Sequence, residues 1–169
     1  LNTADDSLGL RLYGIDPASA LYDPIRQAMV AGEFIAADDR SGIVIGKHLA
    51  DEMKVAVGDR VSLTIINADG NPDEAQFTVR GLFSTGILSY DEGAALMPLA
   101  RAQSFTGAAG HASAIVILLK DRNSADKVAA DLQGDGLQTL GWQKLNEMFI
   151  QAIASSAGFY ILADIIVML

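Results

Sequence analysis

The amino-acid sequence predicts an α+β fold, in which an α/β subdomain is split by an inserted β-rich subdomain. Half of the 169 residues are hydrophobic, which is enough for a substantial core. Candidate strands and helices mix without the regular βαβ rhythm of a parallel α/β fold. The α/β subdomain comprises residues 1–41 and 111–146, the β-rich insertion residues 42–110, and an apolar helix residues 147–169.

Hydrophobic periodicity defines the elements of the first third. Residues 8–14 alternate between apolar and polar side chains, as a half-buried strand does. Residues 21–31 predict a helix that ends at Gly32, and residues 43–45 predict a short buried strand. A second helix is expected over residues 47–53, with Leu49, Ala50 and Met53 on its inner face.

The strongest strand signal lies in the middle of the chain. Residues 60–67 alternate, and an Asp-Gly turn separates them from a partner strand over residues 76–83. Gly81 interrupts the phase of that strand and indicates a bulge. A loop over residues 85–93 follows, and then a short strand over residues 94–97.

Helical and apolar segments complete the pattern. Pro98 precedes a helix over residues 99–105, as expected at a helix start. Residues 113–119 are nearly all apolar and predict a strand buried on both faces. Asn123 is the expected cap of the next helix, and residues 137–140 are the last expected strand.

The final segment, residues 152–169, is almost wholly apolar. A helix that is apolar all round is either deeply buried or in lipid, and a bilayer span needs about 20 such residues. We therefore expect the start of a membrane helix that includes Phe159, Tyr160 and Asp164. A buried core helix is the alternative, which Asp164 favours because a carboxylate in mid-membrane is costly. Within a membrane, Asp164 could equally well form a polar contact with a neighbouring helix.

Composition excludes several functional classes. A formal charge of −9 and an isoelectric point near 4.5 argue against a nucleic-acid partner, which requires clustered Lys and Arg. No basic run flanks the apolar segment, so the positive-inside rule places the preceding domain on the extracytoplasmic face of a cell membrane. The chain has no Cys, which removes disulfides and thiol chemistry.

Catalytic and metal-binding signals are weak, so we expect no catalytic residue, metal or cofactor. His48 and His111 have no second His or Cys at ligand spacing, and the surroundings of Ser84 lack the G-x-S-x-G spacing. The carboxylate pairs at residues 38–39 and 73–74 are adjacent, and such neighbours seldom converge on one substrate atom. Residues 69–73 resemble half of a calcium loop without its closing Glu.

Two loops are the better candidates for contact with a partner, because recognition residues concentrate on loops held by a rigid scaffold. The first carries polar residues at the end of the predicted hairpin, and the second places apolar residues in a polar connection. The alternative for the apolar residues is that they cover the edge of the core. The candidates are Asp69, Asn71, Asp73 and Glu74 in the first loop, and Ile87, Leu88, Tyr90 and Asp91 in the second.

Four stretches in order resemble the extracytoplasmic domain of FtsX-like ABC-transporter permeases, the group that includes MacB and the lipoprotein-releasing LolC and LolE proteins. The first is Tyr13-Gly-Ile-Asp-Pro17, followed by a predicted helix and Ala31-Gly-Glu-Phe34. The second combines Gly42-Ile-Val-Ile-Gly-Lys-His-Leu-Ala50 with Val57-Gly-Asp-Arg-Val61, and the third combines Phe77-Thr-Val-Arg-Gly-Leu-Phe83 with Met97-Pro-Leu-Ala-Arg-Ala-Gln103. Trp142-Gln-Lys-Leu145, just before the apolar segment, is the fourth.

The resemblance implies a porter-like α/β subdomain with a β-rich insertion, and a tail that forms the second membrane helix of a permease. It implies a dimer with a second permease copy or paralogue, and an ABC ATPase subunit or domain in the cytoplasm that does not contact this domain. ATP-driven movement of the outer domain would extract or export a lipoprotein, lipid, peptide or drug. The chain departs from the lipoprotein-releasing members at residues 68–75, which are too short for their chaperone-binding hook. Nothing before Leu8 matches the strand and helix with which the family domain begins.

Two other functional classes remain open from the sequence. A membrane-anchored surface binding module would need only this domain and a single span. A membrane-anchored hydrolase would need a nucleophile or a metal, for which the sequence offers only Ser84 and the two histidines.

Overall fold

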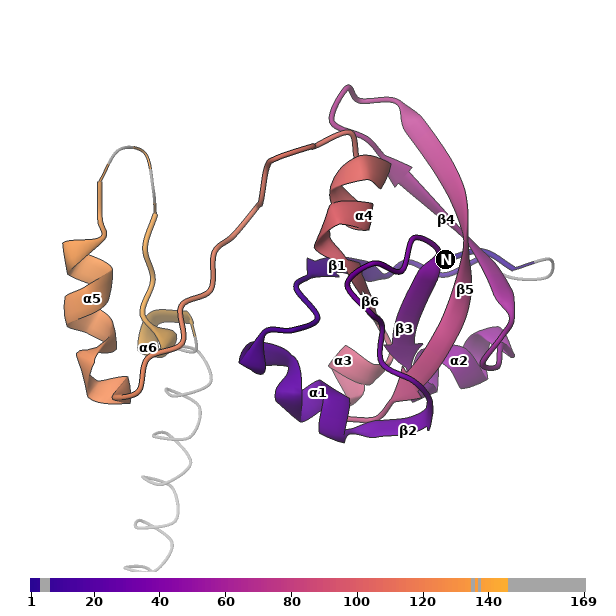
Figure 1. The fold of residues 1–169 in the computed structure, drawn as a ribbon, viewed down its shortest axis with the longest axis horizontal. Helices are drawn as coiled ribbons and strands as arrows, with labels where there is room; N and C mark the ends of the chain where they lie inside the picture. The colour runs from indigo at the N-terminus through magenta and orange to yellow at the C-terminus, as the bar shows by residue number, and fades with distance from the viewer. Residues whose placement is uncertain (4–6, 135, 137, 146–169) are drawn as a thin grey trace, which may run out of the picture. The chain divides into compact units, whose positions relative to one another are not determined.

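The computed structural model describes residues 1–3, 7–134, 136 and 138–145. Contacts divide the chain into two compact units, Leu1–Ile115 and Val116–Leu169. The fold is α+β, as predicted, and the first unit contains a six-stranded mixed sheet (Figure 1). The apolar segment from residue 147, with Phe159, Tyr160 and Asp164, lies outside the described residues. Within those residues, no helix is long and apolar enough to cross a bilayer.

The sheet has the strand order β1-β6-β3-β5-β2, and β4 pairs with β5 outside this path. β1 runs parallel to β6 and β3 parallel to β5, whereas the β2–β5, β3–β6 and β4–β5 pairs are antiparallel. The strands are β1 (Arg11–Ile15), β2 (Met29–Gly32), β3 (Gly42–Gly46), β4 (Arg60–Ile66), β5 (Pro72–Phe83) and β6 (Ala94–Pro98).

Short helices connect and cover these strands. In the first unit, α4 packs against β1 and β6, and α3 lies beside α2 and β3. In the part of the second unit that the structure describes, a short 3₁₀ turn, Arg122–Ser124, precedes two helices. The helices among the described residues are α1 (Asp23–Gln27), preceded by a 3₁₀ turn at Ala20–Tyr22, α2 (Lys47–Met53), α3 (Leu88–Asp91), α4 (Leu99–Phe105), α5 (Ala125–Asp131) and α6 (Trp142–Leu145).

The central strands are buried on both faces because alternate side chains enter two separate clusters. In β3, Ile43 and Ile45 belong to the larger cluster with Phe77 and Leu49, whereas Val44 belongs to the smaller one. The smaller cluster also contains Ile15, Phe83 and Leu96, with Tyr13 and Tyr90 packed against it. The second face of the sheet therefore carries an aromatic group at the side where α3 lies.

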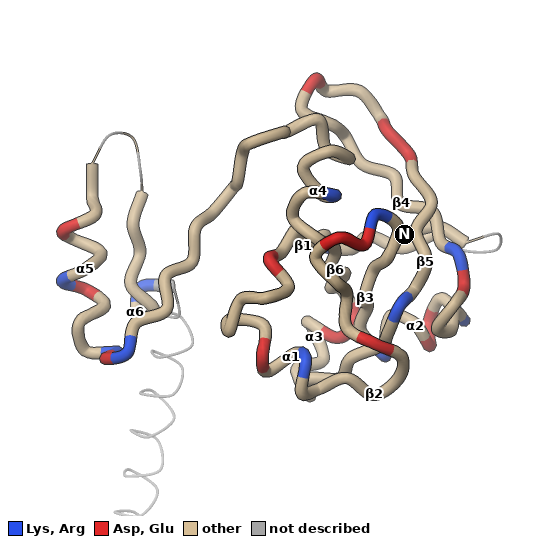
Figure 2. The backbone as a smooth tube through the Cα atoms, in the orientation of Figure 1, with Lys and Arg blue, Asp and Glu red and all other residues tan. Residues whose placement is uncertain are grey.

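Strand pairing joins segments of the first unit that lie far apart in the sequence. Residues 1–41 and 42–110 share one sheet, because β1 pairs with β6 and β2 pairs with β5. Residues from 116 onward form the second unit, which contains α5 and α6. Lys and Arg are scattered over both units rather than gathered in one patch (Figure 2).

Four local predictions were wrong. The helix expected over residues 21–31 ends at Gln27, and residues 29–32 form β2, because pairing with β5 outweighs helical periodicity there. The segment 113–119 is not a strand and is exposed, with Ile115 83% exposed. Residues 138–140 are likewise not in a strand, and Asp121 rather than Asn123 caps the turn before α5.

Other local predictions were confirmed. The helices over residues 47–53 and 99–105 have the expected bounds, and Leu49, Ala50 and Met53 are buried. A register shift opposite β3 falls between Val79 and Gly81, so the expected bulge is present. A side chain at Gly81 would also meet the carbonyl oxygen of Glu33 at 2.6 Å, which explains why glycine fits at this position.

Candidate functional site

The loop between β5 and β6 is organised by one buried carboxylate. Asp91, at the end of α3, is only 1% exposed. Its oxygens accept hydrogen bonds from the backbone N–H of Thr85 at 3.0 Å and of Gly86 at 3.1 Å, and from the Thr85 hydroxyl at 2.8 Å. The Ser84 hydroxyl donates to the same carboxylate at 3.4 Å. The loop is therefore closed around Asp91.

Hydrogen bonding decides the ionisation of this carboxylate. Burial alone would raise the pKa of Asp91, but the donors of Thr85, Gly86 and Ser84 stabilise the charged form, and together they lower the pKa below its usual range. Asp91 is consequently an anion at neutral pH. The sequence placed it among the partner-contact candidates, whereas the structure turns its side chain inward to support the loop.

The outer surface of the same loop carries two apolar side chains. Ile87 is 62% and Leu88 54% exposed. Tyr90 is half-buried and packs with Phe83 and Tyr13, at ring-centroid distances of 5.7 and 5.9 Å. Burial raises the pKa of Tyr90 to about 12, with smaller contributions from Tyr13, Tyr22 and Asp91. The loop thus presents aliphatic side chains beside an uncharged tyrosine.

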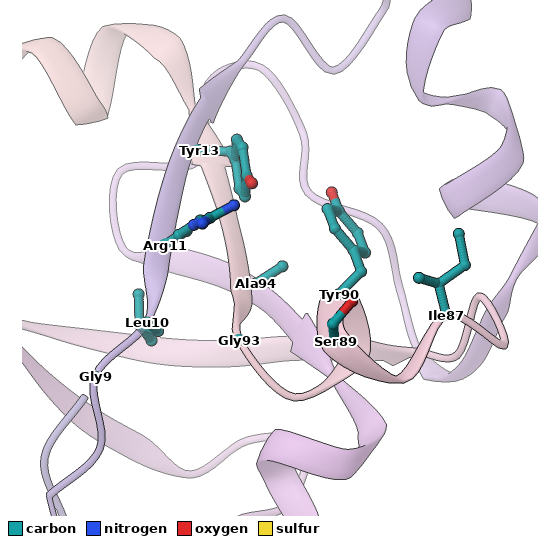
Figure 3. Close-up of a pocket in the computed structure, with 9 residues that line it drawn as sticks. All are labelled: Gly9, Leu10, Arg11, Tyr13, Ile87, Ser89, Tyr90, Gly93 and Ala94. Atoms are coloured by element: carbon teal, nitrogen blue, oxygen red, sulfur yellow. The ribbon is translucent and has the colours of Figure 1, made fainter. Parts of the chain in front are cut away.

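A cavity of about 730 Å³ opens beside this loop, between the beginning of β1 and the beginning of β6. Figure 3 shows Arg11, Tyr13 and Tyr90 extending into the same space, with Ile87 on the far side of Tyr90. Sequence reasoning missed Arg11, Tyr13 and Ser89 as residues of this site. The parallel pairing of β1 with β6, which brings Arg11 opposite Ala94, has no local signature in the sequence.

The hairpin candidates lie elsewhere on the first unit. Asn67 closes the turn, since its side-chain oxygen accepts from the N–H groups of Asp69 at 3.1 Å and Asn71 at 3.0 Å. Asp73 and Glu74 belong to β5 rather than to the loop, and Glu74 accepts a hydrogen bond from the Ser62 hydroxyl. All four candidates are exposed. They form no common site with the loop around Asp91.

The residues considered for chemistry do not converge. His48 is exposed on α2, and the His111 ring is next to the Ala109 carbonyl oxygen at 2.9 Å. The Ser84 hydroxyl donates to Asp91 and has no histidine beside it among its hydrogen-bond partners. Asp39 forms an ion pair with Arg80, whose hydrogen bond holds the pKa of Asp39 below its usual range. The described residues contain no group of three or more His, Cys, Asp or Glu that could hold a metal ion.

Two comparisons with known proteins bear on this arrangement. Residues 2–135 match the family of the MacB-like periplasmic core domain. Over 111 residues the chain is 32% identical to the lipoprotein-releasing system transmembrane protein LolE of Haemophilus influenzae. That alignment covers 63% of this chain and 27% of the relative. The aligned part of the chain therefore spans about a quarter of the length of that relative.

Proposed function

Since this chain belongs to the family of MacB-like periplasmic core domains, we propose that it is the moving extracytoplasmic part of an ABC-transporter permease. In this proposal, ATP hydrolysis in the cytoplasm displaces the domain, and the displacement extracts or exports a lipoprotein, lipid, peptide or drug. The observation that carries the proposal is the family match across residues 2–135. The name of the relative, a lipoprotein-releasing protein, makes lipoprotein the first substrate to test.

The architecture of the first unit supports a mechanical role. A sheet whose central strands are buried on both faces resists deformation, because a close-packed interior transmits displacement rather than absorbing it. The proposal assigns no bond-making step to the domain. ATP hydrolysis belongs to an ABC ATPase subunit or domain in the cytoplasm, which does not contact this domain.

We assign partner contact to the exposed loops, and the dimer partner is a second permease copy or paralogue. Ile87 and Leu88 are the strongest candidates, because burying one such side chain contributes about 1.5–3 kcal/mol. The exposed hairpin residues Asp69 and Asn71 are candidates for a weaker polar contact. The apolar segment from residue 147 is assigned to the membrane, so that the domain stands on the extracytoplasmic face.

Reconstitution of the complete permease with its ATPase in proteoliposomes tests this function. We expect ATP-dependent release of a reconstituted lipoprotein, and we expect the Ile87→Ser, Leu88→Ser double variant to slow that release several-fold. Val57→Ser is the matched control, because Val57 is also an exposed aliphatic residue but lies between α2 and β4. Failure of all four substrate classes to move with ATP would refute transport. Normal release by the double variant would refute only the assigned contact.

The complete gene separates this function from a surface binding module. A permease predicts several further membrane spans and an ATPase encoded in the same protein or beside it. A single span without an ATPase would favour the binding module instead.

A further inference from the structure

The cavity beside the β5–β6 loop combines one cation with apolar walls. Its volume of about 730 Å³ lies within the range of small-molecule sites. Leu10, Ala94 and Ile87 supply aliphatic surface, and the rings of Tyr13 and Tyr90 stand side by side at 5.9 Å. Such a mixture of apolar walls and a few polar groups is typical of sites that orient a small amphipathic ligand.

Among the described residues that line this cavity, Arg11 is the only charged one. Its side chain is exposed, and the ion pairs found among the described residues do not include it. The lining residues that the structure describes include no Asp or Glu, although the chain carries 21 acidic and only 12 basic residues. The described lining therefore carries a positive charge on a protein that is otherwise acidic.

The polar groups around Arg11 can complete the binding of a singly charged anion. Ser89 and the two tyrosines carry hydroxyls that donate hydrogen bonds, and the raised pKa of Tyr90 keeps its hydroxyl protonated. The planar guanidinium matches the two oxygens of a carboxylate. A phosphate dianion would require further cations, which the described residues of the lining do not supply.

We propose that this cavity binds a carboxylate carried on a short aliphatic group, with the carboxylate on Arg11 and the aliphatic group against Tyr90. The C-terminal residue of a peptide and a short acyl acid share this chemistry. Asp91 holds the loop that carries Ile87 and Tyr90, so the site is formed before a ligand arrives. The inference is independent of the transport role, because binding to the cavity is measured directly.

Titration of the isotope-labelled 169-residue chain, followed by amide resonances in NMR, tests the proposal. The probes are N-acetyl-leucine, its neutral analogue N-acetyl-leucinamide, and hexanoate. We expect N-acetyl-leucine to shift the amides of Arg11, Tyr13 and Gly93 saturably, with a Kd on the order of a few mM for a ligand of this size. The neutral amide should bind at least tenfold more weakly. Hexanoate distinguishes the two ligand classes: a site for short acyl acids should bind hexanoate more tightly, and a site for the C-terminal residue of a peptide should bind N-acetyl-leucine more tightly.

Arg11→Gln is the decisive variant, and Arg60→Gln is its matched control. Both arginines are exposed on strands, but Arg60 begins β4 and does not line the cavity. We expect Arg11→Gln to weaken binding of the acids at least tenfold and Arg60→Gln to leave it unchanged, with circular dichroism confirming that both variants fold. Three results would overturn the proposal: no saturable shift with either acid, equal affinity for N-acetyl-leucine and its amide, or wild-type affinity in Arg11→Gln.

Discussion

Replacing Asp91 by Ala removes the group on which the β5–β6 loop closes. Two backbone N–H groups, those of Thr85 and Gly86, lose their acceptor, and the hydroxyls of Ser84 and Thr85 lose theirs. A buried donor left without a partner costs about 1–3 kcal/mol. Because Gly86 is exposed, water can replace part of what is lost there. We therefore expect a loss of about 2–4 kcal/mol in the free energy of closing the loop.

Hydrogen exchange at the Thr85 and Gly86 amides measures this loss directly. A cost of about 2–4 kcal/mol accelerates exchange about 30- to 1,000-fold. Asp51→Asn is the control, because Asp51 is an exposed partner of Lys47 and such surface pairs contribute about 0–1 kcal/mol. If Asp91→Ala exchanges at these two amides as slowly as the wild type, the carboxylate does not hold the loop.

The same carboxylate predicts a pH dependence. The folded-state pKa of Asp91 is lowered, so its stabilisation is fully present above the unfolded-state value near 4 and is lost as pH falls through the folded value. Denaturant unfolding from pH 7 downward should show the wild type losing stability in this acidic window. Asp91→Asn should lose less over the same window, since it has no carboxylate to protonate. Parallel curves for the two proteins would refute the assignment.

Three further predictions concern packing, ionisation and exposed surface. Gly46→Ala should destabilise the first unit by about 1–3 kcal/mol in urea unfolding, because a Cβ at this position would collide with the carbonyl oxygen of Asp91. Gly9→Ala is the control and should be nearly neutral, because a Cβ at Gly9 would lie in open space. In an alkaline absorbance titration, one tyrosine should ionise near pH 12, and this step should be missing in Tyr90→Phe. The raised pKa of Tyr90 also predicts that the free energy of unfolding falls as pH rises above the unfolded-state pKa of tyrosine, near 10. We expect the chain to self-associate in sedimentation through exposed apolar side chains, and we expect Ile117→Ser with Leu118→Ser to reduce that association. Unchanged association in this double variant would refute a contribution from these two residues.

Elements with local stop and start signals were predicted with correct bounds. Helix α2 begins after Gly46 and ends at Met53, and the following residue, Lys54, adopts a left-handed conformation with φ of 55°. Helix α4 begins directly after Pro98. Such signals lie within a few residues of the element that they bound, so they are visible without knowledge of the tertiary structure.

Elements that depend on distant partners were not predictable in this way. Residues 29–32 become a strand because β5 lies beside them, and Gly32 adopts φ of 69° where a Cβ would collide with the Arg80 carbonyl. Residues 113–119 have the composition of a buried strand, but no strand of the described residues pairs with them. Strand propensity expresses packing against neighbours, so the sequence alone cannot decide whether a partner is present.

The candidate loop shows how the same limit applies to a site. Its apolar residues could be found from sequence, because Ile87 and Leu88 interrupt a polar connection. The inward direction of Asp91 could not, because adjacent residues of a short helix differ in burial only once the helix is placed against the sheet. Different residues of this loop therefore hold it closed and present its apolar surface. We therefore expect substitutions at Ile87 and Leu88 to leave the loop closed, because both side chains are exposed, whereas a change at Asp91 should alter both the loop and whatever it contacts.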